Sequence, residues 1–113
     1  MAVALQREST EYLYLGITGG PPSVGAEFAL LAAGQRPDSG DWKTAVVVSG
    51  QAHALWADAK GSGVKGDYYI GCLVGAFGGN TVAPPPGDYQ VWLRLTDTTE
   101  QPVRIAPIAL EIA

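Results

Sequence analysis

The residue types that usually perform nucleophilic or acid–base chemistry are scarce in this sequence. The chain has one histidine, His53, and one cysteine, Cys72, among 113 residues. A Ser-His-Asp or Cys-His arrangement would have to use His53, and nothing around it resembles a nucleophile elbow. Cys72 stands inside an apolar run, which favours the role of a small buried hydrophobic residue. We therefore predict that the chain is not an enzyme and has no catalytic residues.

Metal and cofactor sites find equally little support in the sequence. Zinc sites need several Cys or His ligands at set spacings, and one of each cannot supply them. Calcium ligands could come from RPDSGD (36–41) or LTDTTE (95–100). Both stretches are better interpreted as solvated turns, because Asp and Thr side chains hydrogen-bond their own backbone in turns. The glycine-rich stretches lack the spacing of a phosphate loop. We expect no metal and no cofactor.

Charge and composition narrow the class of partner. The net charge is -4 and the seven Lys and Arg residues do not cluster, which argues against nucleic-acid binding. Only 16% of residues are charged, against about a quarter in typical globular domains, which suits a surface that packs against other proteins. No stretch approaches the roughly 20 apolar residues of a membrane span. The first residues lack the pattern of a secretory signal, so we expect synthesis in a cytoplasm.

The elements that must position any site are short strands. Period-two alternation predicts strands over 11–18, 26–33, 42–50, 67–77, 88–96 and 103–113, with Phe28 and Leu30 facing inward in the second. Residues 52–59 fit either a strand or one short helix. Pro107 removes a ladder hydrogen bond, so the last strand lies at an edge or bends there. We expect an N-terminal arm over 1–10 and one all-β domain over 11–113, an immunoglobulin-like sandwich of seven to eight antiparallel strands.

The strand Asp88 to Thr96 has the most regular alternation. If Tyr89, Val91, Leu93 and Leu95 face the core, then Trp92 and Arg94 face outward. The opposite orientation would bury Arg94, which costs several kcal/mol unless the charge is paired. We therefore predict that Trp92 and Arg94 lie on the outer face of the sheet.

The same argument places three tyrosines, Tyr12, Tyr14 and Tyr69, on outer faces. Trp, Tyr and Arg are enriched in the hot spots of protein interfaces. These three tyrosines, with Trp92 and Arg94, are therefore our candidates for interface residues. The alternative for Trp92 is that a neighbouring loop or an arginine stem covers it.

Two longer stretches carry a family resemblance. The segment GAEFALLAAGQRPDSGDWKTA, followed by GGNTVAPPPGDYQVWLRLTDTTEQPVR and a closing IALEI strand, resembles small immunoglobulin-like structural proteins of tailed bacteriophages. Similar runs occur in phages of actinobacteria, and the layout is similar to the N-terminal domains of baseplate upper proteins. In immunoglobulin-like domains the tyrosine of the PGxYxV motif ties its hydroxyl back to the backbone at the sheet corner. The resemblance implies this corner role for Tyr89.

The resemblance also implies a function and a location. It implies a non-catalytic virion protein without a cofactor, most simply a head decoration protein or another capsid- or neck-associated subunit. A tail or baseplate subunit is the alternative. Its partners would be major capsid, neck or tail proteins and copies of itself in a symmetric assembly. The absence of a cysteine pair fits assembly in a bacterial cytoplasm, where thiols stay reduced.

A module that binds host-surface glycan is the other hypothesis. Aromatic rings stack on sugar rings, so Trp42, Trp56 and Trp92 could together form such a site.

Overall fold

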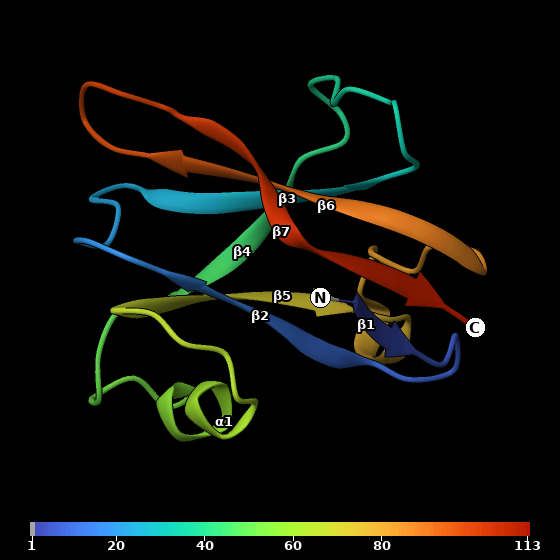
Figure 1. Ribbon diagram of the computed structural model, residues 1–113, viewed down its shortest axis with the longest axis horizontal. Coiled ribbons are helices and arrows are strands. Elements are labelled where there is room, and N and C mark those ends of the chain that lie inside the picture. Colours follow the sequence, from blue (N-terminus) through green and yellow to red (C-terminus); the bar gives the residue numbers. More distant parts are fainter. Residues whose placement is uncertain (1) are drawn as a thin grey trace.

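Seven strands form one mixed, curled sheet in the computed structural model, which describes residues 2–113 without the side chains of residues 2, 107 and 108 (Figure 1). The strands are β1 (Ala2–Leu5), β2 (Glu11–Ile17), β3 (Gly25–Leu31), β4 (Lys43–Val48), β5 (Tyr68–Val74), β6 (Gly87–Thr96) and β7 (Val103–Ile112). Their order in the sheet is β1-β7-β6-β3-β4-β5-β2. The predicted all-β class and the six predicted strands are confirmed.

The first ten residues differ from the expected arm. Residues 2–5 form β1, which pairs in parallel with the C-terminal half of β7, from Ala109 to Ile112. The other strand pairs are antiparallel. The sheet is therefore mixed, and the expectation of antiparallel strands alone is wrong.

Strand β4 connects two layers of the curled sheet. Its residues 43–45 pair with β3, while residues 46–48 pair with β5. In Figure 1, β4 runs from the group of β3, β6 and β7 toward the group of β2 and β5. A single strand that changes partners half-way along its length thus turns one sheet into two facing layers.

The core lies between these layers and follows the predicted alternation. Val91 and Leu93 on β6 are 0% and 4% exposed, and Phe28 on β3 is 1% exposed. Tyr68, Ile70, Cys72 and Val74 on β5 pack in the same cluster, as the sequence predicts. Leu30, Tyr89 and Leu95 are partly buried against it.

Residues 52–59 contribute to a helix, α1 (Trp56–Gly61), which ends the ambiguity in the sequence. Alanines at 57 and 59 favour a helix, and Asp58 and Lys60 have the charges that suit its first and last turns. The chain leaves the helix through Gly63, whose φ of 86° suits glycine. A 3₁₀ turn, η1 (Phe77–Gly79), follows β5. Within residues 2–113 no helix combines the length and hydropathy that a membrane crossing requires.

The predicted irregularity at Pro107 is present in the backbone. Gln90 of β6 lies opposite Ala109, but Trp92 lies opposite Ile105, so residues 106–108 oppose Val91 alone. This is a bulge, which bends a strand and interrupts its ladder. β7 is not an edge along its whole length, because residues 109–112 lie between β6 and β1.

Candidate interaction site

Trp92 lies on the outer face of β6, as predicted, but it is only 6% exposed. Its ring packs with Ala29 and Leu31 of β3 and with the half-buried Trp42. The guanidinium of Arg36 lies 5.6 Å from the ring centroid. The predicted exposure of Trp92 is therefore wrong. A neighbouring segment and an arginine cover it, which is the alternative that the sequence left open.

Arg94 is paired with residues of its own chain. Its Nη2 and Nε atoms donate to Glu27 Oε1 at 2.6 and 3.0 Å. Glu27 lies directly across the β3–β6 ladder from Arg94. The Arg94 guanidinium also lies 4.5 Å from the ring centroid of Trp42, within cation–π range. Arg94 is outward and half-buried, and its charge is paired within its own chain.

The three candidate tyrosines lie on the outer face of β2 and β5, where α1 covers two of them. Tyr14 and Tyr69 are 5% and 4% exposed, so their predicted exposure is wrong. The Tyr14 hydroxyl donates to Asp58 Oδ2 at 2.6 Å, and the Trp56 ring meets Tyr69 edge-on at 5.1 Å. Tyr12, the third, is half-buried, and its ring stacks on Tyr14 with centroids 5.8 Å apart.

Gly71 makes room for these stacked rings. A Cβ at this position would lie 3.2 Å from Tyr12 Cδ1 and 3.3 Å from Tyr14 Cε1. Burial, and then the hydrogen bond to Asp58, raise the pKa of the Tyr14 hydroxyl well above its ordinary value. Asp58 and Gly71 were not predicted, because no local pattern links either of them to β2.

Tyr89 makes the contact that a corner role requires. Its hydroxyl donates to the carbonyl oxygen of Pro85 at 2.6 Å, four residues upstream. The bond joins the start of β6 to the proline run that precedes it. The corner role implied by the resemblance thus has a matching hydrogen bond.

The three tryptophans of the glycan hypothesis do not form one surface. Trp42 and Trp92 share a cluster on the β3–β6 layer. Trp56 packs in a different cluster, with Tyr69 and Tyr14 on the β2–β5 layer.

The residues considered for chemistry have structural surroundings. His53 Nδ1 accepts a hydrogen bond from the Leu55 amide at 3.1 Å, in the turn before α1. Cys72 is fully buried, and burial raises the pKa of its thiol. Across the described residues, no three His, Cys, Asp or Glu side chains gather closely enough to suggest a metal site. Neither of the two calcium candidates, 36–41 and 95–100, therefore brings three such side chains together.

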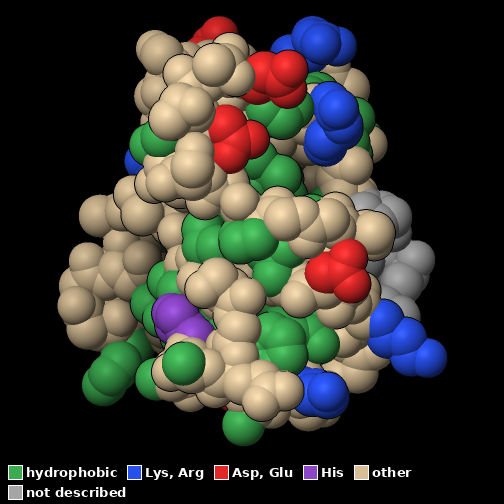
Figure 2. Space-filling view, turned by 90° about the vertical axis from the view of Figure 1, so that its left-hand side faces the viewer, with side chains coloured by type: hydrophobic (Ala, Val, Ile, Leu, Met, Phe, Trp, Pro, Cys, Tyr) green, Lys and Arg blue, Asp and Glu red, His purple; other side chains and the backbone are tan. Residues whose placement is uncertain are grey.

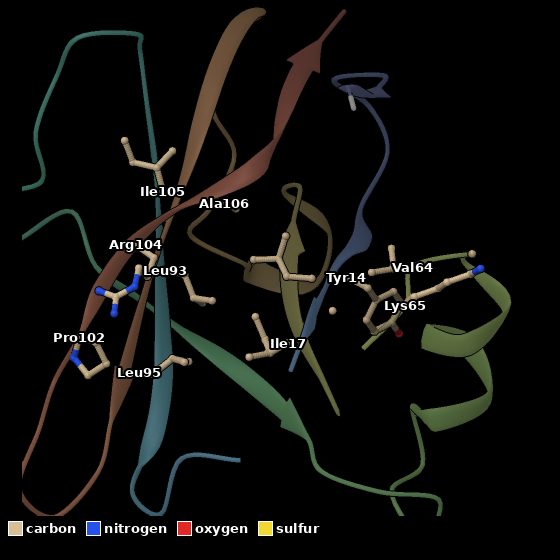
Figure 3. Close-up of a pocket in the computed structure, with 13 residues that line it drawn as sticks. Tyr14, Ile17, Val64, Lys65, Leu93, Leu95, Pro102, Arg104, Ile105 and Ala106 are labelled. Carbon is tan, nitrogen blue, oxygen red and sulfur yellow. The ribbon is translucent and has the colours of Figure 1, made fainter. Parts of the chain in front are cut away.

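A groove of about 620 Å³ opens between the two layers, and no pattern in the sequence predicts it. Figure 3 shows side chains of β6 and β7 on one side and those of β2 and residues 63–65 on the other. Its lining is mainly apolar and includes Leu15, Ile17, Val64, Leu93, Leu95, Pro102, Ile105 and Ala106. Viewed from the left-hand side of Figure 1, hydrophobic side chains show in the middle of the face, with charged side chains mostly around them (Figure 2).

Two strand edges border this groove. β2 is the last strand in the sheet order, so only β5 pairs with it among the described residues. Residues 103–105 of β7 pair with β6 on one side only, whereas β1 pairs with residues 109–112. Strand edges of this kind present backbone N–H and C=O groups to whatever lies beside them. We call the hollow and its two borders, β2 residues 14–17 and β7 residues 103–106, the edge groove.

Comparisons with models of protein families, with curated proteins and with solved structures find no match to this chain.

Proposed function

We propose that this chain is a structural, non-catalytic subunit of a tailed-phage virion that works through contacts with other protein chains. The observation that carries the proposal is the edge groove, an apolar hollow with a strand edge on each side. Apolar surface and strand edges are what a neighbouring chain can cover. The resemblance of the Pro84–Arg104 run to phage structural proteins supplies the virion as the place of assembly.

The strand pairing supports the finer proposal of an immunoglobulin-like sandwich. In that fold the second and fifth strands pair in one layer, while the third, sixth and seventh strands form the other layer with the sixth in the middle. Here β2 pairs with β5, and β3, β6 and β7 are neighbours. The Tyr89–Pro85 hydrogen bond agrees with a sheet corner at the start of β6.

We place the subunit on the head or neck, with a tail or baseplate position as the alternative. Several outward side chains already contact other side chains of the same chain, as in the Arg94–Glu27 ion pair. The contacts with partners are then made through the edge groove and the exposed side chains around it, such as Ile105, which is 51% exposed. Neither nucleic acid nor a membrane is a partner in this proposal.

The proposal is tested on particles from cells in which the chain is made together with its own phage. Particles are banded on a density gradient, heads are separated from tails, and each fraction is analysed by mass spectrometry. We expect the chain in the head fraction at a fixed ratio to the major capsid protein. Recovery with tails would select the alternative position, and recovery only outside the particles would overturn the proposal.

A further inference from the structure

We propose that the edge groove binds an extended segment of a partner protein that pairs with a strand edge and places a carboxylate opposite Arg104. This inference rests on the proposed function and names the kind of partner segment that its contacts require. It follows from the strand edges, the apolar floor and the position of one cation.

The strand edges favour a peptide as the occupant. Any occupant of the groove removes water from the borders, and buried backbone N–H and C=O groups need new hydrogen-bond partners. A strand supplies these partners along its whole length, whereas an alkyl chain supplies none. Residues 14–17 and 103–106 can each pair with a segment of about four residues, which spans roughly 13 Å.

The apolar floor sets the alternation of that segment. Leu93, Leu95 and Ile17 belong to or pack against the core cluster, and all three line the groove. In an added strand every second side chain points to one face. The segment therefore needs apolar residues at alternate positions, with polar residues between them that face water.

Arg104 sets the charge of the segment. It lies directly opposite Leu93 in the β6–β7 ladder, and cross-strand partners share a face, so Arg104 belongs to the groove side of β7. Its Nη1 donates to the carbonyl oxygen of Val103, and within residues 2–113 no carboxylate forms an ion pair with it. The other cation of the lining, Lys65, points its ammonium away from the hollow in Figure 3. A carboxylate on the inward face of the segment would complement Arg104.

The test uses two short synthetic peptides of alternating valine and threonine. One has aspartate and the other lysine in place of the central inward valine, and binding to the full chain is measured by fluorescence polarisation. We expect the aspartate peptide to bind about tenfold more tightly. In Arg104→Glu the preference should reverse, because the charge opposite the central position is reversed.

Matched controls separate this site from general charge effects. Arg7→Glu makes the same charge change in the exposed turn between β1 and β2, where Arg7 pairs with Glu8, and it should keep the preference for aspartate. An aspartate peptide with N-methyl groups on alternate amides cannot complete the backbone ladder and should bind at least about tenfold more weakly. Amide exchange at residues 14–17 or 103–106 should slow when the unmethylated peptide binds.

Several results would overturn the inference. Equal binding of the aspartate and lysine peptides would remove the role of Arg104, and undiminished binding of the methylated peptide would remove strand pairing. Binding of laurate but of neither peptide would make the groove a lipid site. A concentration-dependent dimer in sedimentation that Ile105→Lys abolishes would make a second copy the occupant. If the chain is found in particles but binds neither peptide, the virion proposal stands while this inference fails; peptide binding without particle association gives the opposite result.

Discussion

At the scale of single residues, the indole of Trp92 fills the space between β6, β3 and the segment that carries Arg36 and Trp42. Because the ring is 6% exposed, Trp92→Ala should lower the free energy of unfolding by about 3–5 kcal/mol, the usual cost of emptying such a site. Urea denaturation of the purified chain measures this loss. A melting curve that does not change would return Trp92 to the list of interface residues.

The Tyr89 hydroxyl contributes one hydrogen bond to the start of β6. Tyr89→Phe keeps the ring and removes the bond to the Pro85 carbonyl, so we expect a loss of about 1 kcal/mol. Tyr12→Phe is the matched control, because within residues 2–113 the Tyr12 hydroxyl forms no hydrogen bond with another protein group. Equal stability of the two variants would remove the corner role.

The Tyr14 hydroxyl gives the fold a dependence on alkaline pH. Its pKa is raised in the folded chain, so the folded chain keeps this proton at pH values where the unfolded chain loses it. The stabilisation is complete below pH about 10, the pKa of an unperturbed tyrosine, and falls as the pH rises further. Denaturation series from pH 8 to about 11.5 should show a shallower decline for Tyr14→Phe. Burial also raises the pKa of Tyr68 and Cys72, so these residues keep part of the decline. An identical slope in the variant would contradict the assignment.

At the scale of elements, one wall of the edge groove depends on Gly16 of β2. A Cβ there would lie 2.1 Å from the Lys65 carbonyl oxygen and 2.9 Å from Val64 Cγ1, so Gly16→Ala must displace the segment after α1. We expect a loss of about 1–3 kcal/mol and weaker peptide binding, since that segment lines the groove. Gly20→Ala is the control, because its added Cβ meets no atom within 4 Å. Equal stability of the two variants would show that residues 63–65 do not pack on β2.

The strands could be predicted because apolar and polar residues alternate along each strand, and this local pattern shows which face points to the core. Val91, Leu93 and Trp92 lie on the predicted faces, and Tyr68 to Val74 alternate as expected. What covers an outer face is decided by segments far away in the chain, which period-two patterns do not encode. Asp58 reaches Tyr14 across 44 residues and Glu27 reaches Arg94 across 67. The period-two pattern therefore predicts which face points outward but not whether that face is open to solvent.

The edge groove could not be predicted for a related reason. It arises from the order of strands in the sheet, which leaves β2 and the first half of β7 with one partner each among the described residues. Leu93, Leu95 and Ile17 look like ordinary core positions in the sequence. The curl of the sheet leaves a gap between the β2 edge and the β6–β7 layer, and these three side chains line that gap.

At the scale of the whole molecule, the parallel pairing of β1 with β7 has a mechanical consequence. Residues Ala2–Leu5 and Ala109–Ile112 run side by side in the same direction. The N-terminus and the C-terminus therefore lie at opposite ends of this strand pair. Tension applied to the two termini therefore pulls them along each other, so the bonds between them share the load at once and do not break one after another. Stretched in an optical trap, the chain should rupture at a clearly higher force than a version that starts at Gln6. Equal rupture forces would mean that the terminal strands carry no tension. A chain with this pairing would act as a link that resists stretching between its two ends.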